Sequence, residues 1–213
     1  MGTLVLWRHG ETAWNAEHRF QGCNADTPLT PLGRHQAAAA APRVAAYRPD
    51  AVVTSPLGRA RDTAAAVETL LGLTATVDDR LREIDVGDWC GLTVTEVLAQ
   101  DPQYAAARAA GADYRHGRTG ETATQLGVRV GEALRAAGAA DGTTLVVGHG
   151  WGFQMGVANL LGWDFALSRG LGVMRNCAVS VLRPGPVGWS IAVWNRSLVD
   201  DDVARPVHGD GTV

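Results

Sequence analysis

The sequence predicts an α/β fold, a three-layer sandwich with a mostly parallel central sheet flanked by helices. Short apolar runs rich in strand-forming residues alternate along the chain with longer segments of helical composition. The alternation closes with two strands joined through a Pro/Gly turn, within residues 176–195. The chain has 213 residues, which is enough to bury a sizeable core within one medium domain.

The first half of the chain contains three predicted strands and two predicted helices. Pro42 is expected to kink or interrupt the first helix, which is rich in alanine. Ser55 is a suitable N-terminal cap for the second helix, and Gly72 marks its end. The predicted strands are residues 3–7, 50–55 and 74–78, and the predicted helices are residues 30–47 and 55–72.

The second half is less regular. A loop at residues 81–97 leads into a short helix, and residues 102–120 show no clean periodicity. The elements predicted after them are a helix at residues 120–138, a buried strand at residues 143–148 and a helix at residues 151–162. We expect one domain over residues 1–198, in which residues 101–120 form a lid-like excursion, followed by a polar, flexible tail at residues 199–213.

Composition excludes several classes of function. The formal net charge of −3 gives no indication of a nucleic-acid or membrane partner. All 19 basic residues are arginine, which excludes chemistry on a lysine amine. Cys23, Cys90 and Cys177 lack the spacing of a zinc site or a disulfide framework, so no metal is expected. Because the chain shows no signal peptide and no long apolar run, we expect a soluble, cytoplasmic protein.

The tripeptide Arg-His-Gly occurs twice. The first copy, at residues 8–10, stands at the carboxyl end of an apolar strand, where parallel sheets bind their ligands. Gly10 is expected to let the backbone approach a ligand closely. The second copy, at residues 115–117, follows a segment without strand character and is expected on a surface excursion. The first copy is therefore the catalytic candidate, and the second is a coincidence.

His9 has counterparts elsewhere in the chain. His149 also ends an apolar strand and precedes a glycine, and Arg59 lies shortly after another strand. A single histidine at a strand end is more often structural. Here, however, two histidines are joined by two arginines, Arg8 and Arg59. These four side chains would repel one another if they met at one point, unless an anion neutralised them. With helix N-termini nearby, this set indicates a site for a phosphoryl group.

Six segments stand out when the chain is followed from Thr3 to Gly150. They are LVLWRHGETAWN, FQG, DTPLTPLGRHQA, TSPLGRARDTA, LREIDVGDWCGLT and VVGHG. Together and in this order they resemble the histidine phosphatase (phosphoglycerate mutase-like) superfamily. AVSVL and WSIAVWN are similar to its closing strands. The motif REIDVGDWCG resembles the phosphatase branch rather than the mutases, so the resemblance implies a phosphoglycerate mutase-like fold and a phosphatase.

The resemblance also implies roles for the residues of the cluster. His9 would be the nucleophile that attacks phosphorus and becomes a phosphohistidine. Arg8, Arg59 and His149 match the family's phosphate pocket, and Asn15 matches a further donor. No cofactor and no metal is implied, because guanidinium and imidazole groups supply the positive charge.

Glu83 matches the family's acid, which protonates the leaving group. Without the resemblance, an exposed glutamate paired with Arg80 or Arg82 would be the simpler interpretation. Asp85 and Glu121 are less suited to the acid role, and Glu121 is expected at a helix start or at the edge of the pocket.

Further residues are expected on the substrate side. Gln21 and Gly22 match the family's loop over the pocket, and Gly150 and Trp151 directly follow His149. Arg115, in the excursion, is assigned to an anionic substrate, the alternative being a solvated loop. Three more aromatic residues either line the substrate side or belong to the core: Trp14, Phe20 and Trp89.

The function that follows is metal-independent hydrolysis of a small phosphorylated metabolite. Phosphoglycerate mutase-type transfer is the alternative, and a non-catalytic protein that binds a phospho-ligand is a third interpretation. Residues 170–182 are faintly similar to phosphatases acting on glucosylated phosphoglycerate, while broad small-molecule phosphatases and ribazole-phosphate phosphatases are also compatible. A homodimer is compatible with the sequence, which defines neither the substrate nor an interface.

Overall fold

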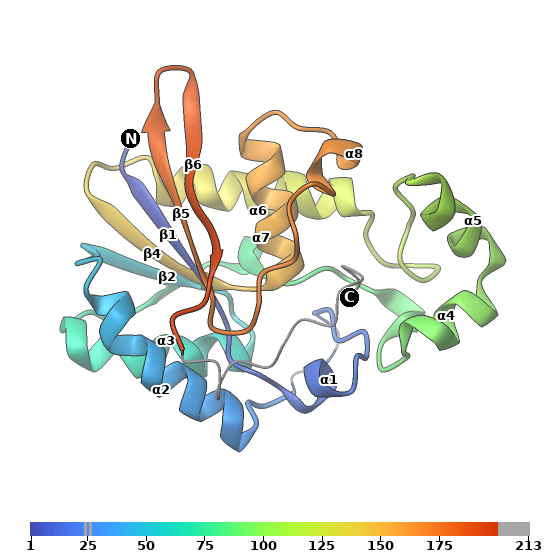
Figure 1. Cartoon of the computed structure of the whole chain (residues 1–213), viewed down its shortest axis with the longest axis horizontal. Coiled ribbons are helices and arrows are strands. Elements are labelled where there is room, and N and C mark those ends of the chain that lie inside the picture. Colours follow the sequence, from blue (N-terminus) through green and yellow to red (C-terminus); the bar gives the residue numbers. More distant parts are fainter. Residues whose placement is uncertain (24, 26, 200–213) are drawn as a thin grey trace.

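The computed structural model describes residues 1–23, 25 and 27–199, which form one six-stranded sheet with helices on both faces (Figure 1). The strands are β1 (Thr3–Arg8), β2 (Ala51–Thr54), β3 (Thr76–Val77), β4 (Thr143–Gly148), β5 (Val179–Gly185) and β6 (Gly188–Arg196). Their order is β3-β2-β4-β1-β5-β6. Among these strands, only β5 runs in the opposite direction to the others. The predicted α/β sandwich with a mostly parallel sheet is confirmed.

Helices on the two faces complete the three layers (Figure 1). They are α1 (Ala13–Ala16), α2 (Pro31–Ala45), α3 (Gly58–Leu71), α4 (Val94–Gln100), α5 (Pro102–Ala110), α6 (Ala123–Ala137), α7 (Gly150–Leu160) and α8 (Phe165–Ser168). Side chains alternate across β1, so Val5 and Trp7 pack with α2 and α3, whereas Leu4 and Leu6 pack with α6 and α7. In the described part of the chain, no helix is long and apolar enough to cross a membrane.

Three predicted elements differ in detail. α2 continues through Pro42, although the proline lacks the N–H that would bond to the carbonyl of Ala38. The third strand shrinks to the exposed pair Thr76–Val77 at the sheet edge. α3 begins at Gly58, three residues after Ser55, whose Oγ accepts a hydrogen bond from the Leu57 N–H at 3.3 Å. The predicted end of α3 at a glycine is confirmed.

The excursion before α6 contains a helix that the sequence analysis did not predict. α4 and α5 lie apart from the sheet (Figure 1). The Asp101 side chain caps α5, Pro102 occupies its first position, and Gly111 ends it with a φ of 67°. The expectation of irregular chain is therefore wrong here, because capping residues and alanine propensity suffice where hydrophobic periodicity is weak. The lid-like role of residues 101–120 stays a prediction.

The described chain ends packed against the body of the protein. Leu198 and Val199 are both 7% exposed and belong to the core beneath α2 and α3. The Leu198 carbonyl accepts a hydrogen bond from Arg43 at 2.5 Å. Val199 is thus no part of a flexible tail, and the other residues of the predicted tail, 200–213, lie outside the described residues. The domain boundary at residue 198 stays a prediction.

The closing hairpin is present as predicted, and it contains an irregularity. β5 and β6 shift register between Val179 and Leu182. On the opposite strand Asn195 adopts a φ of 54°, which asparagine tolerates better than most residues. Its side chain accepts from the Arg175 N–H at 2.7 Å and donates to the Val173 carbonyl at 3.1 Å. The bulge is therefore bonded to the loop that precedes β5.

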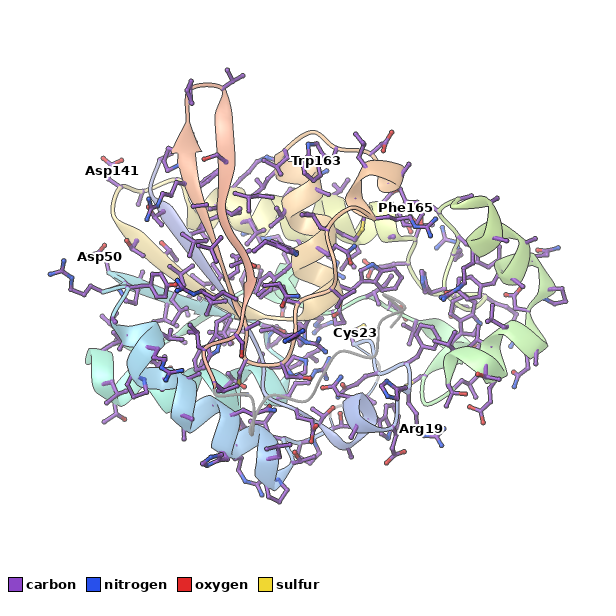
Figure 2. All side chains as sticks on the ribbon, viewed as in Figure 1. Arg19, Cys23, Asp50, Asp141, Trp163 and Phe165 are labelled. Carbon is purple, nitrogen blue, oxygen red and sulfur yellow. The ribbon has the colours of Figure 1, made fainter. Side chains whose placement is uncertain are left out.

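The strand order brings three strand ends together at one edge of the sheet. β2, β4 and β1 are adjacent and parallel, so Ser55, His149 and His9, which directly follow them, stand in a row. Asp50 and Asp141 precede β2 and β4 and mark the opposite end of the sheet in Figure 2. The carboxyl ends of the strands are where a ligand site is expected in such a sheet.

Candidate active site

A hydrogen bond to the backbone determines the tautomer of His9. The residue is 3% exposed, and its Nδ1 lies 2.7 Å from the Gly10 carbonyl oxygen. Because a carbonyl only accepts, Nδ1 carries the hydrogen and Nε2 keeps its lone pair. Burial, followed by the charges of Arg59 and Arg8, holds the pKa of His9 well below its ordinary value. The ring is therefore neutral, and Nε2 is available as a nucleophile.

His149 faces His9 from the neighbouring strand. The two ring centroids are 5.2 Å apart, and His149 Nε2 lies 2.8 Å from Ser55 Oγ. Burial and the charge of Arg59 lower the pKa of His149 well below its ordinary value. Its Nδ1 is buried and has no hydrogen-bond partner among the residues that the structure describes. Such a nitrogen is costly unless a ligand completes it.

Arg8 borders the histidine pair. Its guanidinium donates to the Met174 carbonyl, while its Nε is buried and unpaired within the described part of the chain. Burial lowers the pKa of Arg8 to about 10, and the Glu83 carboxylate opposes this change. Arg8 therefore stays charged at neutral pH and has one donor available to an anion.

Arg59 is held by the loop that contains Gly22. It is 1% exposed and donates to the carbonyls of Gly22 at 2.7 Å and of Ala25 at 3.1 Å. Gly22, with a φ of 54°, thus orients an arginine, and its predicted contact with substrate stays a prediction. The structure brings together the four residues predicted to surround a phosphoryl group: Arg8, His9, Arg59 and His149.

The Glu83 carboxylate lies at the N-terminus of α7, beside this cluster. Oε1 accepts from the Gly152 N–H at 2.9 Å and from the Ile84 N–H at 3.0 Å. Oε2 accepts from the Trp151 N–H at 3.2 Å. The carboxylate charge also acts on Arg8, so Glu83 and the cluster belong to one electrostatic site.

The simpler interpretation of Glu83, as a surface partner of a neighbouring arginine, is not what the structure shows. Arg80 pairs with Asp78 at 2.7 Å, and Arg82 lies 3.8 Å from Asp79. Both arginines are thus engaged by aspartates of their own segment, and Glu83 is half-buried.

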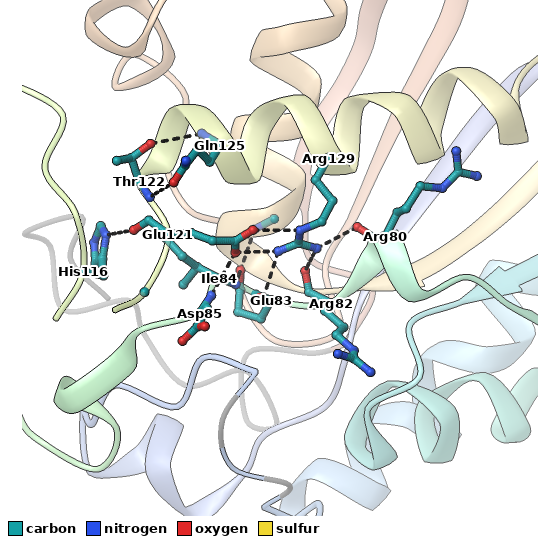
Figure 3. A network of polar contacts seen from close by, with 12 residues as sticks. Arg80, Arg82, Glu83, Ile84, Asp85, His116, Glu121, Thr122, Gln125 and Arg129 are labelled. Atoms are coloured by element: carbon teal, nitrogen blue, oxygen red, sulfur yellow. Dashed lines mark hydrogen bonds and ion pairs between the residues drawn. The ribbon is translucent and has the colours of Figure 1, made fainter. Parts of the chain in front are cut away.

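A clamp from the start of α6 holds the backbone around Glu83 (Figure 3). Arg129 donates to three carbonyl groups of the segment 80–83, at 2.8, 2.9 and 3.3 Å. Both oxygens of Glu121 accept from the same guanidinium, at 2.9 and 2.7 Å, and Oε2 also accepts from the Asp85 N–H at 3.0 Å. Glu121 and Arg129 therefore fix the chain on both sides of Glu83.

Asn15 and Gln21 are bonded to the loop after β1. Thr12 caps α1, and its hydroxyl accepts from the Asn15 N–H and donates to Gln21 Oε1 at 3.1 Å. The Asn176 amide donates to Asn15 Oδ1 and to the His9 carbonyl, each at 3.1 Å. Gln21 Nε2 is buried and unpaired among the described residues, so it is available to donate a hydrogen bond to a ligand. Contacts of Asn15 and Gln21 with a ligand stay predictions.

Two motif glycines allow close packing. A Cβ on Gly10 would lie 2.3 Å from the Gly33 carbonyl oxygen, so Gly10 lets the loop approach α2. The expectation that Gly10 also lets the backbone approach a ligand stays a prediction. A Cβ on Gly150 would lie 3.1 Å from Arg8 Cζ and 2.9 Å from Val173 Cγ1. Gly150 thus makes room for the Arg8 guanidinium, and its contact with substrate stays a prediction.

A cavity of about 580 Å³ lies beside Trp151. Its walls come from the excursion, from α7 and α8, and from the loop that precedes β5. Trp151 also holds Glu83 through its N–H, so it links the cavity to the cluster. Of the aromatic residues whose place the sequence left open, Phe20 and Trp151 line the cavity, Trp89 is buried in the core, and Trp14 packs over Gly91.

The second Arg-His-Gly copy is not a solvated surface segment. His116 is 2% exposed, with its ring centroid 4.7 Å from that of Trp151 and 5.0 Å from that of Trp89. Its Nδ1 donates to the Glu121 carbonyl at 3.1 Å, and burial lowers the pKa of His116 to about 4. The expectation was wrong because the rings that bury His116 are distant in sequence.

Arg115 is exposed and donates to the Gly120 carbonyl at 2.5 Å. It does not line the cavity, whereas Arg108 and Arg169 do. The structure therefore does not bring Arg115 to the other predicted site residues.

Sequence analysis missed three supporting residues. Ser55 was interpreted as a helix cap, although a serine at a strand end beside two histidines is a signal that could have been used. Asn176 lies in the closing segment MRNCAVSV, where nothing marks it as a partner of His9. Arg129 stands inside an amphipathic helix, and only the folded structure shows what it reaches.

Comparison with known proteins agrees with this geometry. The profile of the histidine phosphatase superfamily (branch 1) matches residues 4–197. The chain belongs to this superfamily. This histidine phosphatase is 33% identical, over 193 residues, to a probable phosphoglycerate mutase of Yersinia pestis, a match that covers 90% of this chain and 89% of that protein.

Solved structures of this superfamily are similar over nearly the whole chain. A mycobacterial glucosyl-3-phosphoglycerate phosphatase in complex with VO3 is 34% identical, with a TM-score of 0.83, over 92% of this chain and 100% of that one. A phosphoserine phosphatase of Entamoeba histolytica, in complex with 3-phosphoglyceric acid, is 26% identical, with a TM-score of 0.82, over 93% and 100%. The predicted family and the predicted class, a phosphatase-type hydrolase, are confirmed.

Proposed function

We propose that this histidine phosphatase hydrolyses the monoester of a small phosphorylated metabolite through a phosphohistidine on His9, without a metal ion. The observation that carries the proposal is the state of the cluster. His9 has its tautomer set by Gly10, while Arg8 Nε and His149 Nδ1 are buried and unpaired among the described residues. In the tautomer in which His149 Nε2 accepts from Ser55 Oγ, Nδ1 carries the hydrogen and is a donor. Two such donors beside a neutral imidazole fit the oxygens of a phosphoryl group.

The first step transfers the phosphoryl group to the enzyme. His9 Nε2 attacks phosphorus in line, so the N–P bond forms as the bond from phosphorus to the ester oxygen breaks. The guanidinium groups of Arg8 and Arg59 neutralise the equatorial oxygens. The imidazole gains positive charge, which strengthens its Nδ1 hydrogen bond to the Gly10 carbonyl. Glu83, protonated at this stage, gives its proton to the ester oxygen, and a neutral alcohol leaves.

The second step returns the enzyme to its starting state. A water molecule attacks the phosphohistidine, and the Glu83 carboxylate takes the proton that the water loses. The N–P bond breaks, so His9 regains the lone pair on Nε2 and inorganic phosphate leaves. Glu83 is then protonated again for the next ester.

Phosphoglycerate mutase-type transfer is the second candidate, because the Yersinia pestis relative is named for that activity. In this reaction the phosphohistidine would pass its phosphoryl group to a hydroxyl of the bound acid instead of water. A bisphosphate would be needed to prime His9. The solved relatives that are named phosphatases support hydrolysis.

The test is phosphate release from a metabolite panel in the presence of EDTA, with product analysis by mass. The panel holds 3-phosphoglycerate with and without its bisphosphate, glucosyl-3-phosphoglycerate, phosphoserine, sugar phosphates, ribazole phosphate and nucleotides. We expect free phosphate from at least one ester, unaffected by EDTA and lost in His9→Ala. Phosphate that moves without release would establish a mutase. Tight phosphate binding without turnover would establish a binding protein, and loss of activity in EDTA would contradict the metal-independent mechanism.

A further inference from the structure

We propose that the alcohol released by this enzyme is a bulky, mostly apolar ring system that carries a second acidic group, bound in the cavity beside Trp151. The inference rests on the proposed function, because it treats the cavity as the site for the alcohol of the cleaved ester. It concerns the class of substrate, which the names of the relatives do not assign to this chain.

The cavity adjoins the cluster of Arg8, His9, Arg59 and His149, called the phosphate cluster below, through Trp151 and Val173. Trp151 lines it, follows Gly150 in the chain and donates its N–H to Glu83 at 3.2 Å. Val173 also lines the cavity and packs against Gly150, the glycine that makes room for Arg8. A phosphoryl group at Arg8 therefore has its ester oxygen near Glu83 and its alcohol beyond Trp151, inside the cavity.

The size and the walls of the cavity favour a ring. About 580 Å³ lies within the range of pockets that hold drug-sized molecules, and it exceeds what a three-carbon acid fills. Five of the wall residues are aromatic: Phe20, Tyr104, Tyr114, Trp151 and Phe165. Phe165 lies on the side of the body that faces α5 (Figure 2). Aromatic walls bind flat apolar groups through burial and through ring stacking.

The polar side chains of the wall have few hydrogen bonds left for a sugar. Gln154 Nε2 already donates to two backbone carbonyls, and Ser168 Oγ donates to a third. The Tyr114 hydroxyl is bonded to the carboxylate that caps α5. Gln154 Oε1 and His116 Nε2 are unpaired among the described residues, which leaves two acceptors. Apart from the guanidinium groups of Arg108 and Arg169, the wall therefore offers few hydrogen bonds to a polyhydroxylated alcohol.

The charges of the wall favour an anion. Arg108 and Arg169 line the cavity, and neither forms an ion pair within the part of the chain that the structure describes. Arg169 Nη1 would lie 2.6 Å from a Cβ on Gly111, so its guanidinium reaches the end of α5, the helix that carries Arg108. The Asp113 carboxylate is bonded to the first N–H groups of α6. Two arginines against one aspartate leave one net positive charge, and His116, with a pKa of about 4, adds none.

Four synthetic esters separate the contributions of ring and charge: ethyl phosphate, phosphoglycolate, 2-naphthylmethyl phosphate and its 6-carboxylate. Each releases a primary alcohol, so the leaving groups are comparable. We expect the ring to raise kcat/KM by at least about tenfold. We expect the carboxylate to add about threefold at low salt. Glucosyl-3-phosphoglycerate, which has a ring and an acid but many hydroxyl groups, should be hydrolysed more slowly than the carboxylated naphthyl ester.

Variants assign the two effects to the wall. Arg108→Gln combined with Arg169→Gln should remove the gain from the carboxylate and keep the gain from the ring. Arg183→Gln, at an exposed position on β5 outside the cavity wall, is the matched control. Phe165→Gln should reduce the gain from the ring, and circular dichroism and thermal unfolding check that the variant is folded.

Equal kcat/KM values for the four esters, or a preference for the glucosyl ester, would overturn the inference and leave the phosphatase reaction standing. If the carboxylated naphthyl ester keeps its higher kcat/KM in the variant that combines Arg108→Gln with Arg169→Gln, the proposed binding site for the second acidic group is overturned. If no ester in either panel shows hydrolysis that depends on His9, the proposed function fails, and this inference fails with it.

Discussion

The neutral state of His9 is a property of its neighbours. Burial is the largest cause of its lowered pKa, and the charges of Arg59 and Arg8 add to it, while the hydrogen bond to Gly10 acts in the opposite direction. An ordinary histidine loses its lone pair to a proton in mildly acidic solution, near pH 6.5. His9 keeps its lone pair there, beside the same arginines that would bind the phosphoryl group.

His9→Ala should abolish turnover, because no other group in the cluster can form the covalent intermediate. We expect kcat to fall by about three orders of magnitude or more. Phosphate release and intact mass after rapid quenching measure the rate and the bound phosphate. His35→Ala, at an exposed position, is the control. An adduct of phosphate that persists in His9→Ala would place the nucleophile elsewhere.

Glu83→Gln should slow esters of basic alcohols far more than activated aryl phosphates, because only the former need a proton on the departing oxygen. A loss of about 10² to 10⁴ is expected for the alkyl esters. The amide oxygen can still accept from the N–H groups of Gly152 and Ile84, which both bond to Oε1, whereas the NH2 group that replaces Oε2 cannot accept from the Trp151 N–H. Parallel losses on both kinds of ester would remove Glu83 from the acid role.

Glu83, the proposed acid, lies in a loop and not in a regular helix or strand. The segment around Glu83 is a loop that follows a short 3₁₀ turn at Asp79–Leu81, yet its backbone is bonded to Arg129 of α6 and to Glu121 (Figure 3). The ion pair between Arg129 and Glu121 is about one quarter exposed on each side, so solvent screens it only in part. The position of Glu83 therefore depends on contacts with Arg129 of α6 and with Glu121.

Arg129→Gln should shift Glu83 relative to the ester oxygen without removing it. We expect a loss of about tenfold to hundredfold on alkyl esters and little change on activated aryl phosphates. Kinetics on both ester classes would show this dependence on the leaving group, which a general loss of structure would not reproduce. Arg135→Gln, one turn and a half further along α6, is the matched control. Equal loss on both ester classes would make the clamp a purely structural contact.

Elements with a strong local signal were predictable. β1, β4, the end of α3 and the closing hairpin all have apolar runs or turn residues that act within a few positions. α5 lacked such periodicity, and its local signs were the capping residues Asp101 and Gly111, Pro102 at its start and its alanine content. The burial of His116 and the reach of Arg129 depend on partners brought near by folding. The phosphate cluster was predictable because strand ends meet at one sheet edge, whereas the cavity was not, since distant segments enclose it.

Within the part of the chain that the structure describes, three histidines are buried in their neutral form: His9, His116 and His149. In the unfolded chain a histidine takes up a proton near pH 6.5. Between the lowered pKa in the folded state and this value, the unfolded state binds more protons than the folded one. The free energy of unfolding therefore rises with pH in this window. It decreases as the pH falls below about 6.5.

His116 allows a direct test of this acid sensitivity, because it lies outside the phosphate cluster. Its window runs from pH 6.5 down to about 4. His116→Gln should lower the slope of the unfolding free energy against pH by about 1.4 kcal/mol per pH unit there. Urea unfolding at a series of pH values measures the slope, with His35→Gln as the matched control. A slope equal to that of the unchanged protein would mean that His116 is protonated in the folded state.

The bulge at Asn195 has two consequences that are usually treated separately. A straight edge strand invites another sheet to join it, and a register shift in β6 makes that pairing geometrically poor. The same asparagine ties the loop that supplies the Met174 carbonyl to Arg8, so this guanidinium is preorganised and loses little freedom when an anion arrives. Asn195 would thus both disfavour pairing of β6 with the edge of another sheet and keep Arg8 positioned to bind an anion. Selection on either property would retain it.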